Sequence, residues 1–485
     1  MKKRNLLFAA IFTMVMFAGF SVKAQDSVFS YAYQGTTLYY IIDSNQHARV
    51  VPPLYPNMHY NADSTESSSW YGYAQPQGDV VVPESVVFNG TNYPVTAVEA
   101  YTFYRCYDVT SVTLPVTVTY LEHDAFWLAT SLQSVSMPSV TWIGEACFYS
   151  DSSLTNVTVP AGVTELAAWT FGNCTSLQSV DLPDGITTMN DGVFYCCYSL
   201  QSVILPSTLT NIGSGAFYEC YSLQSIDIPG SVNTIDDWSF NLCSSLTNVT
   251  MHEGTQTIGR CSFRECYNLT TINYPTSLKM IGDFAFQYDT SLAIPLILPE
   301  GLTYLGIVAY GDCSSIVTAT IPGSLETIAS QVFWGCSSLA TVTIEDGITE
   351  IRDGAFFNCF SIDTLYVKCT VPPYLGTANN GAFADYHSVV VVPCSTAVVY
   401  HNYAVWELFS EIIEDCGVGI PEVDFPEVTI RVTNSCIEVE GAGGETVRVF
   451  DITGRLVRNE ALSAGVYLVQ IGNRPAQKVV VHPNM

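Results

Sequence analysis

Positive charge is scarce in this chain. Its 485 residues hold 17 Lys and Arg against 45 Asp and Glu, which gives a formal net charge of −28 at pH 7. Nucleic acid binding needs a basic surface that neutralises phosphates, so the composition argues against nucleic acid and against anionic membrane surfaces as partners. The acidic excess favours solubility outside the cell. Capture of Ca²⁺ by clustered carboxylates is the alternative, but the sequence has no Asp-x-Asp-x-Asp loop, and we expect no metal and no cofactor.

Long apolar runs and the common catalytic motifs are also missing. Beyond residue 24 no stretch approaches the roughly 18 apolar residues of a transmembrane helix, so we expect no transmembrane segment. The motifs HExxH and GxSxG, the P-loop and a GxGxxG after a strand do not occur, and the histidines show no paired spacing. Cys394 with His387 or His401 could form a nucleophile and base, although a structural cysteine in a terminal cap is the simpler interpretation. We therefore expect no enzymatic activity, and an exported hydrolase is only a third possibility.

The chain contains a sequence repeat of about 23 residues that occurs twelve times. Its clearest copy runs from Ile212 to Pro229 and contains the pattern Ile-Gly-x-x-Ala-Phe-x-x-Cys-x-Ser-Leu. A fixed period in this range is typical of a solenoid, because one repeat cannot bury its own apolar face and must stack on its neighbours. The aromatic residue of the repeat recurs every 22, 23 or 24 residues, at Phe103, Phe126, Phe148, Phe171, Phe194, Phe217, Phe240, Phe263, Phe286, Tyr310, Phe333 and Phe356.

Apolar columns within the repeat predict its core and its strand. An aliphatic residue stands five positions before the aromatic, as Ile212 does before Phe217, and another stands six positions after it, as Leu223 does. The segment Leu223–Ile228 then alternates polar and apolar residues, which indicates a strand, and Pro229 ends it. We predict a repeat solenoid of the leucine-rich-repeat type with about twelve repeats of ~23 residues and one short parallel β-strand in each. The outward strand residues form a hydroxyl-rich, mildly acidic face: Ser134, Ser136, Asn156, Thr158, Ser179, Asp181, Ser202, Asp227, Thr250, Thr271, Thr320 and Thr343.

On these columns the repeat resembles the leucine-rich repeats of the BspA-like family. The resemblance rests on Ile212-Gly213, Ala216-Phe217, Cys220 and Ser222-Leu223 and their counterparts, and it covers the chain from Tyr93 to Pro393. It implies a right-handed solenoid on a bacterial or protozoan cell surface, often in an adhesin or host-interaction protein. It does not imply one particular ligand.

The two ends of the chain differ from the repeats. A basic start, the apolar run Leu6–Phe20 and the small residues before Gln25 indicate a secretory signal peptide. The turn Asn89-Gly90 predicts a hairpin within an N-terminal β-rich cap, and helical spacing over Tyr400–Phe409 closes the other end. The predicted organisation is signal peptide 1–24, N-terminal cap 25–96, solenoid 97–365, C-terminal cap 366–411, acidic linker 412–426 and C-terminal domain 427–485.

The last 59 residues have a different pattern. Tight alternation between Val428 and Val481 predicts a small β-sandwich of six or seven strands. This segment resembles the type A C-terminal sorting domain of the Bacteroidetes type IX secretion system. The resemblance implies type IX machinery as a partner, an outer-membrane surface or extracellular location, and removal of the domain on the way there. The matching residues are Asp451, Gly454, Arg455, Gly465, Tyr467 and Lys478.

Sixteen cysteines in an exported chain first suggest disulfides, but the repeat argues otherwise for most of them. Nine occupy one column, three positions after the core aromatic, where Ala129, Asp151 and Asp289 also occur. We expect buried free thiols in that column, acting as small apolar groups and weak donors. The vicinal pair Cys196-Cys197 is not a metal motif. The better disulfide candidates lie outside the column: Cys369, Cys394, Cys416 and Cys436.

Tyrosine is the distinctive residue of the predicted loops. Rings that are not core columns can anchor a partner, because they offer large contact area at little entropic cost. The alternative is that they pack over one another and seal the loops. We predict a non-enzymatic binding protein, an adhesin for host extracellular proteins or other cells, with glycan binding in nutrient capture as the alternative. The candidate ligand-binding residues are Tyr104, Tyr107, Tyr195, Tyr198, Tyr218, Tyr221 and Tyr267.

Overall fold

The computed structural model describes residues 28–55, 69–376 and 381–416, together with six strands of the C-terminal region. The predicted signal peptide and most of the predicted linker lie outside these residues. The chain divides into two compact units, Met1–Glu414 and Asp415–Met485. Among the described residues, no helix is long and apolar enough to cross a membrane.

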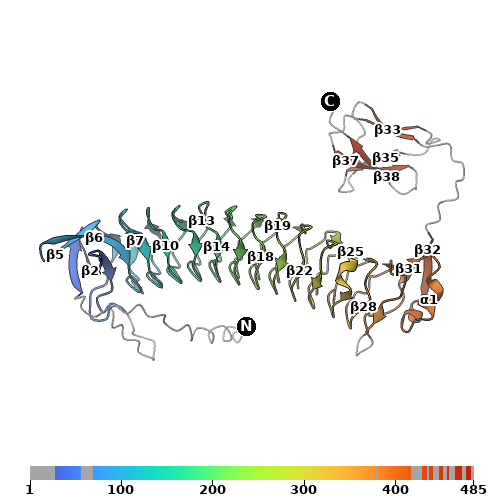
Figure 1. Ribbon diagram of the computed structural model, residues 1–485, viewed down its shortest axis with the longest axis horizontal. Coiled ribbons are helices and arrows are strands. Elements are labelled where there is room, and N and C mark those ends of the chain that lie inside the picture. The colour runs from blue at the N-terminus through green and yellow to red at the C-terminus, as the bar shows by residue number, and fades with distance from the viewer. Residues whose placement is uncertain are drawn as a thin grey trace. The chain divides into compact units, whose positions relative to one another are not determined.

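The predicted solenoid is confirmed, and each full turn carries the expected strand at the tail of its repeat (Figure 1). Neighbouring strands pair in parallel with a shift of one repeat, so that Ser225 faces Asn248 and Ile226 faces Val249. The strand pairing of this ladder is interrupted between β9 and β11, between β15 and β17, and between β21 and β23. The ladder contains β7 (Val109–Thr113), β9 (Ser134–Ser136), β11 (Asn156–Thr158), β13 (Ser179–Asp181), β15 (Ser202–Val203), β17 (Ser225–Ile228), β19 (Asn248–Met251), β21 (Thr271–Ile272), β23 (Leu296–Ile297), β25 (Thr318–Ile321), β27 (Thr341–Ile344), β29 (Thr364–Val367) and β31 (Val389–Pro393).

A second ladder of two-residue strands, absent from the sequence prediction, runs along another side of the solenoid. Except in the last strand, the second residue of each is the aliphatic residue predicted for the core; Ile212, for example, pairs with Ile235 of the next turn. The prediction missed it because two residues cannot show an alternating pattern. The strands are β8 (Tyr120–Leu121), β10 (Trp142–Ile143), β12 (Glu165–Leu166), β14 (Thr188–Met189), β16 (Asn211–Ile212), β18 (Thr234–Ile235), β20 (Thr257–Ile258), β22 (Met280–Ile281), β24 (Tyr304–Leu305), β26 (Thr327–Ile328), β28 (Glu350–Ile351) and β30 (Tyr374–Leu375).

The third side of each turn is a loop with two left-handed residues. In the turn of Phe240 these are Trp238 and Leu242, both with φ of 62°. The loop still bonds to the next turn, because the amide of Phe240 donates to the carbonyl of Ser262 at 2.7 Å and that of Leu242 donates to Arg264 at 2.9 Å. Backbone groups are therefore paired between turns on all three sides, as buried amides and carbonyls require.

The core aromatics stack into one ladder inside the solenoid. Neighbouring rings from Phe103 to Phe383 have centroids 4.9–5.8 Å apart and are close to parallel. Every ring predicted for this column is buried, and Phe383 extends it by one turn. The distance between neighbouring rings follows from the separation of roughly 4.8 Å between paired strands, because each turn places its ring at the same position relative to its strands.

The N-terminal cap continues both ladders. Strand β4 (Gly78–Val81) pairs in parallel with β7, and β6 (Thr91–Val98) pairs in parallel with β8. The predicted hairpin joins β5 (Ser85–Phe88) to β6 through Asn89 and Gly90, which both have positive φ. The remaining cap strands are β1 (Phe29–Tyr33), β2 (Thr36–Ile42) and β3 (Ala48–Val51).

The C-terminal cap ends the aromatic ladder with a perpendicular ring. Phe409 meets Phe383 at an interplanar angle of 80°, and Trp406 donates its indole N–H to the carbonyl of Pro373 at 2.7 Å. The helical residues are α1 (Ala397–His401) and the 3₁₀ turn Trp406–Leu408, followed by β32 (Glu411–Asp415). Strand β32 occupies the first positions of the predicted linker, because Ile412 is buried against the core and the strand pairs with β31.

The described strands of the C-terminal unit form two antiparallel sheets. The first pairs β33 (Thr429–Thr433) with β34 (Cys436–Glu440). The second has the order β36 (Leu456–Val457), β35 (Val447–Asp451), β37 (Gly465–Ile471) and β38 (Gln477–Val481). The backbone register pairs Asp451 with Tyr467 and Lys478 with Leu468, while Gly465 opens β37; Gly454 and Arg455 lie outside the described residues.

Candidate binding surface on the loops

A chain of aromatic rings covers the loop side of six successive turns. Ring centroids lie 5.1 Å apart for Tyr104 and Trp127, 6.3 Å for Trp127 and Tyr149, 6.3 Å for Tyr149 and Trp169, 5.1 Å for Trp169 and Tyr195, and 4.9 Å for Tyr195 and Tyr218. Tyr104 is buried, whereas Tyr195 and Tyr218 are half-buried. This inner column therefore packs between turns, as the alternative interpretation of the tyrosines expected.

Trp169 was not among the residues predicted for the binding surface. It stands two positions before its core aromatic, whereas the other rings of the column stand one position after theirs. Gly192 in the next turn makes room for it, because a Cβ there would collide with the ring of Trp169, just as a Cβ at Gly172 would collide with the ring of Tyr149. The signal available in the sequence was a glycine, Gly192, 23 residues after the tryptophan and therefore in the same position of the next turn.

An outer column of tyrosines is open to solvent. Tyr198 and Tyr221 stack with centroids 5.1 Å apart, and their exposed fractions are 37% and 38%. Tyr107 and Tyr267 are also exposed but stand in other turns. The structure thus brings together Tyr195, Tyr198, Tyr218 and Tyr221, called here the tyrosine patch, in two adjacent turns. Tyr104 and Tyr107 lie four turns before Tyr195, roughly 20 Å along the stack, and Tyr267 lies two turns beyond Tyr221.

One carboxylate sits within the tyrosine patch. Glu219 is half-buried in a left-handed conformation (φ 58°), and Cys196 donates its thiol to Oε2 of Glu219 at 3.6 Å. Burial and the neighbouring Glu219 carboxylate together raise the pKa of Tyr218 to about 12. Burial and a hydrogen bond to the same carboxylate also raise the pKa of Tyr221. The tyrosines are therefore neutral hydrogen-bond donors at physiological pH, arranged around a single negative charge.

The cysteine column is a structural feature of the core. All nine predicted members are free and buried, which confirms the expectation of free thiols. Except for Cys106, these thiols donate to the carbonyl of the core aromatic one turn earlier, as Cys220 does to Phe194 at 3.2 Å and Cys243 to Phe217 at 3.1 Å. Burial raises the pKa of the Cys220 and Cys243 thiols, so these two stay protonated and unreactive.

Two aspartates replace cysteine in this column. Oδ1 of Asp151 accepts the amide of Ala129 at 2.8 Å, and Oδ1 of Asp289 accepts the amide of Cys266 at 2.9 Å. The second oxygen of each is buried without a partner among the described residues. Burial raises the pKa of both carboxyl groups well above the usual range.

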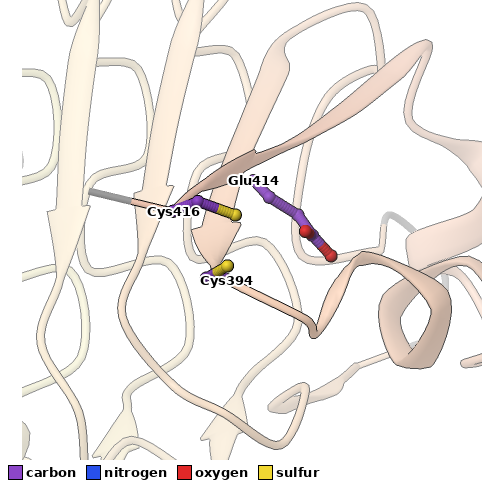
Figure 2. Close-up of side chains that lie close together, drawn as sticks. All are labelled: Cys394, Glu414 and Cys416. Atoms are coloured by element: carbon purple, nitrogen blue, oxygen red, sulfur yellow. The ribbon is translucent and has the colours of Figure 1, made fainter. Parts of the chain in front are cut away.

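Cys394, Glu414 and Cys416 form a second cluster, at the end of the solenoid (Figure 2). One ligand atom from each lies within 4.8 Å of the others, a spacing that would suit a metal ion. However, both cysteines are disulfide-bonded, and Oε1 of Glu414 accepts the amide of Ala397, the first residue of α1, at 2.9 Å. The side chains are thus engaged in closing the C-terminal cap.

This cluster settles part of the disulfide prediction. Of the four candidates, Cys394 and Cys416 are bonded, Cys369 is buried and free, and Cys436 opens β34 with a side chain outside the described set. A bonded cysteine has no thiolate, so the hypothesis of Cys394 as a nucleophile is wrong for this structure.

The repeats match a known family of sequences. The model of the BspA type leucine-rich repeat region matches in six copies, over residues 96–221, 168–293 and 258–390, which is more than half of the chain. No curated protein matches the chain.

Several solved structures are similar in fold. A leucine-rich repeat protein from Bacteroides ovatus is 20% identical, with 71% of this chain and 94% of that chain covered and a TM-score of 0.45. A leucine rich cell surface protein from Faecalibacterium prausnitzii is 23% identical, with 70% and 95% covered and a TM-score of 0.37. The pneumococcal vaccine antigen PcpA is 15% identical, with 80% and 98% covered and a TM-score of 0.44. At these identities the likeness concerns the fold alone.

Proposed function

Because this chain belongs to the family of proteins with BspA type leucine-rich repeats, we propose that it is a non-enzymatic binding protein, an adhesin for host extracellular proteins or other cells. The observation that carries the proposal is the tyrosine patch, in which the exposed pair Tyr198 and Tyr221 stacks beside the half-buried pair Tyr195 and Tyr218. Such rings bury a large area for few rotatable bonds, which is typical of interface anchors.

The solenoid supports this role by holding the rings in place. Loop backbones of neighbouring turns are hydrogen-bonded to each other, as the amide of Cys196 is to the carbonyl of Tyr218 at 2.7 Å. A partner therefore meets rings that are already ordered, and little conformational entropy is lost on binding. Glycan binding in nutrient capture is the alternative, favoured by exposed rings beside a carboxylate and hydroxyl groups.

We also propose the route by which the protein reaches its partner. Residues 1–24 act as a signal peptide, and residues 427–485, which lie within the second compact unit, act as a type IX sorting domain that directs the mature protein to the outer-membrane surface or outside the cell. The disulfide-bonded Cys394 and Cys416 of the C-terminal cap agree with an oxidising destination. Mass spectrometry of the native protein should show a start at Gln25, and deletion of Val428–Met485 should trap the chain in the periplasm; normal surface display of the deleted chain would contradict the sorting role.

Substitution of the tyrosine patch tests the binding function. The variant Tyr195→Ser, Tyr198→Ser, Tyr218→Ser, Tyr221→Ser is compared with wild type on a panel of immobilised matrix proteins and on a glycan array. A matched control, Tyr304→Ser, Tyr366→Ser, Tyr374→Ser, removes exposed rings from the strand sides. We expect loss of matrix-protein binding in the patch variant alone. Equal binding by both variants would contradict the patch as the site, and binding to glycans only would favour the alternative.

A further inference from the structure

We propose, resting on the binding function above, that the tyrosine patch and Glu219 form a docking site for an arginine side chain of a protein partner. The site consists of four tyrosine rings in two stacked pairs and the carboxylate of Glu219. This carboxylate accepts hydrogen bonds from the hydroxyl of Tyr221 and the thiol of Cys196. Tyrosine faces attract cations through their π electrons, and a carboxylate can accept two parallel hydrogen bonds from a guanidinium.

Within the described part of the chain, no basic side chain forms an ion pair with Glu219. Glu265 and Glu345 in other turns each pair with a basic side chain. A carboxylate has about four acceptor positions, so the bonds from Tyr221 and Cys196 leave capacity for a further donor. The negative charge beside the rings is therefore available to an incoming cation.

A later turn of the same protein shows how such a site is filled. Glu265 stands in the same column as Glu219, two positions after its core aromatic, and has the same left-handed conformation (φ 63°). There Nη1 of Arg264 pairs with Oε1 of Glu265 at 3.0 Å, while Tyr267 donates its hydroxyl to Oε2 at 2.7 Å. The guanidinium of Arg264 also lies over the ring of Tyr288, 5.5 Å from its centroid.

The turn of Glu219 has the same parts without the arginine. Tyr218 takes the position of Arg264, and Tyr221 takes that of Tyr267. Arg105 over Tyr104 at 5.1 Å and Arg260 over Phe284 at 5.6 Å repeat the stacking elsewhere, so three of the four arginines in residues 97–365 lie over a ring. The missing group at Glu219 is thus a guanidinium, and we assign it to the partner.

The charge of the whole chain favours the same kind of partner. A formal charge of −28 attracts basic segments and raises their association rate. Arginine fits better than lysine, because its planar guanidinium can stack on a ring and bind a carboxylate at the same time.

The test measures binding of defined peptides to the full exported chain. The probe is a fluorescent peptide of alternating glycine and arginine, and its control is the same peptide with citrulline, which keeps the shape and loses the charge. The variant Glu219→Gln is compared with Asp227→Asn, which removes an equal charge from an exposed strand position. Both are conservative substitutions, and thermal melting checks that each variant folds.

We expect Glu219→Gln to weaken arginine-peptide binding about tenfold, Asp227→Asn to change it less than twofold, and the citrulline peptide to bind at least tenfold more weakly than the arginine peptide. Equal binding of the two peptides, or equal weakening by the two variants, would overturn the site, since only the overall charge would then matter. If the tyrosine variant loses matrix-protein binding while Glu219→Gln leaves peptide binding unchanged, the arginine site fails and the binding function stands. If Glu219→Gln behaves as expected but the tyrosine variant still binds matrix proteins, the arginine site stands and the adhesin site lies elsewhere.

Discussion

Two aromatic ladders run along this solenoid, and they differ in what they do. The core ladder from Phe103 to Phe383 is continuous and buried, while the loop ladder from Tyr104 to Tyr218 is partly exposed and stops at Asn241. Both inherit a spacing near 5 Å from the rise of the turns. A regular stack of rings is therefore no sign of function by itself. The two ladders differ in exposure, and only the loop ladder lies beside Glu219, a carboxylate that forms no ion pair among the described residues.

The largest effect should come from breaking the core ladder. Replacing Phe217 by Ala removes a fully buried ring between Phe194 and Phe240 and should lower the free energy of unfolding by about 3–5 kcal/mol. Tyr221→Ala, in the outer loop column of the same turn, should cost about 1 kcal/mol or less. Urea denaturation followed by circular dichroism compares the two, and equal midpoints would erase the distinction between the ladders.

The end of the core ladder should be nearly as sensitive. The disulfide-bonded Cys394 and Cys416 hold β31 and β32, which carry the cap that covers Phe383. Closing a loop of this length with a disulfide stabilises a fold by about 3 kcal/mol. The double variant Cys394→Ser, Cys416→Ser should therefore unfold its C-terminal cap at a lower urea concentration than the wild type. Cys436→Ser is the control. Because the other described cysteines of the solenoid are free, a reductant should reproduce the effect; an unchanged urea midpoint with reductant would contradict it.

A smaller and pH-dependent effect should come from the two aspartates beside the core ladder. Burial raises the folded-state pKa of Asp151 and Asp289. Their contribution to the free energy of unfolding is therefore fully present below the unfolded-state pKa of about 4, and it is lost as the pH rises towards the folded-state pKa. Changing both to Cys, the common residue of the column, should therefore stabilise the protein by about 1–3 kcal/mol at pH 7 and by less at pH 4. An equal gain in urea midpoint at both pH values would show that their ionisation is not involved.

The smallest effect on stability should come from the outer loop column. Tyr198→Ser with Tyr221→Ser removes two half-exposed rings and should shift the melting temperature by only a few degrees. Binding to the matrix protein should nevertheless fall about thirtyfold, since one good anchor is worth about 2 kcal/mol. A large fall in melting temperature would place these rings with the core ladder as packing elements.

The core ladder could be predicted from the sequence, because the same residue type returns to the same place every turn. The period alone therefore located Phe217, Cys220 and Leu223 inside. Four cysteines were predicted as disulfide candidates, but the bonded pair could not be chosen among them. Disulfide formation depends on the distance between Cα atoms, and the sequence does not give that distance. Strand β32 was assigned to the linker because its acidic residues conceal the single buried Ile412.

The loop site could be predicted only in part. Seven tyrosines were identified by type and position, but their division into a patch of four and three distant rings depends on which turns are adjacent. The role proposed for Glu219 could not be predicted, because a single glutamate among 45 acidic residues gives no signal in the sequence, and only the structure shows that none of the ion pairs among the described residues involves it. Its comparison with Glu265 needed the ion pair to Arg264.

The most direct test of the central claim is to map which rings a partner covers. Hydroxyl-radical footprinting of the full chain, alone and bound to the matrix protein that binds best in the panel, reports the oxidation of each tyrosine. We predict that oxidation of Tyr198 and Tyr221 falls several-fold on binding, while that of Tyr304 and Tyr374 on the short-strand side stays the same. Protection of Tyr304 and Tyr374 with Tyr198 and Tyr221 unchanged would contradict the account and place the binding site on the strands.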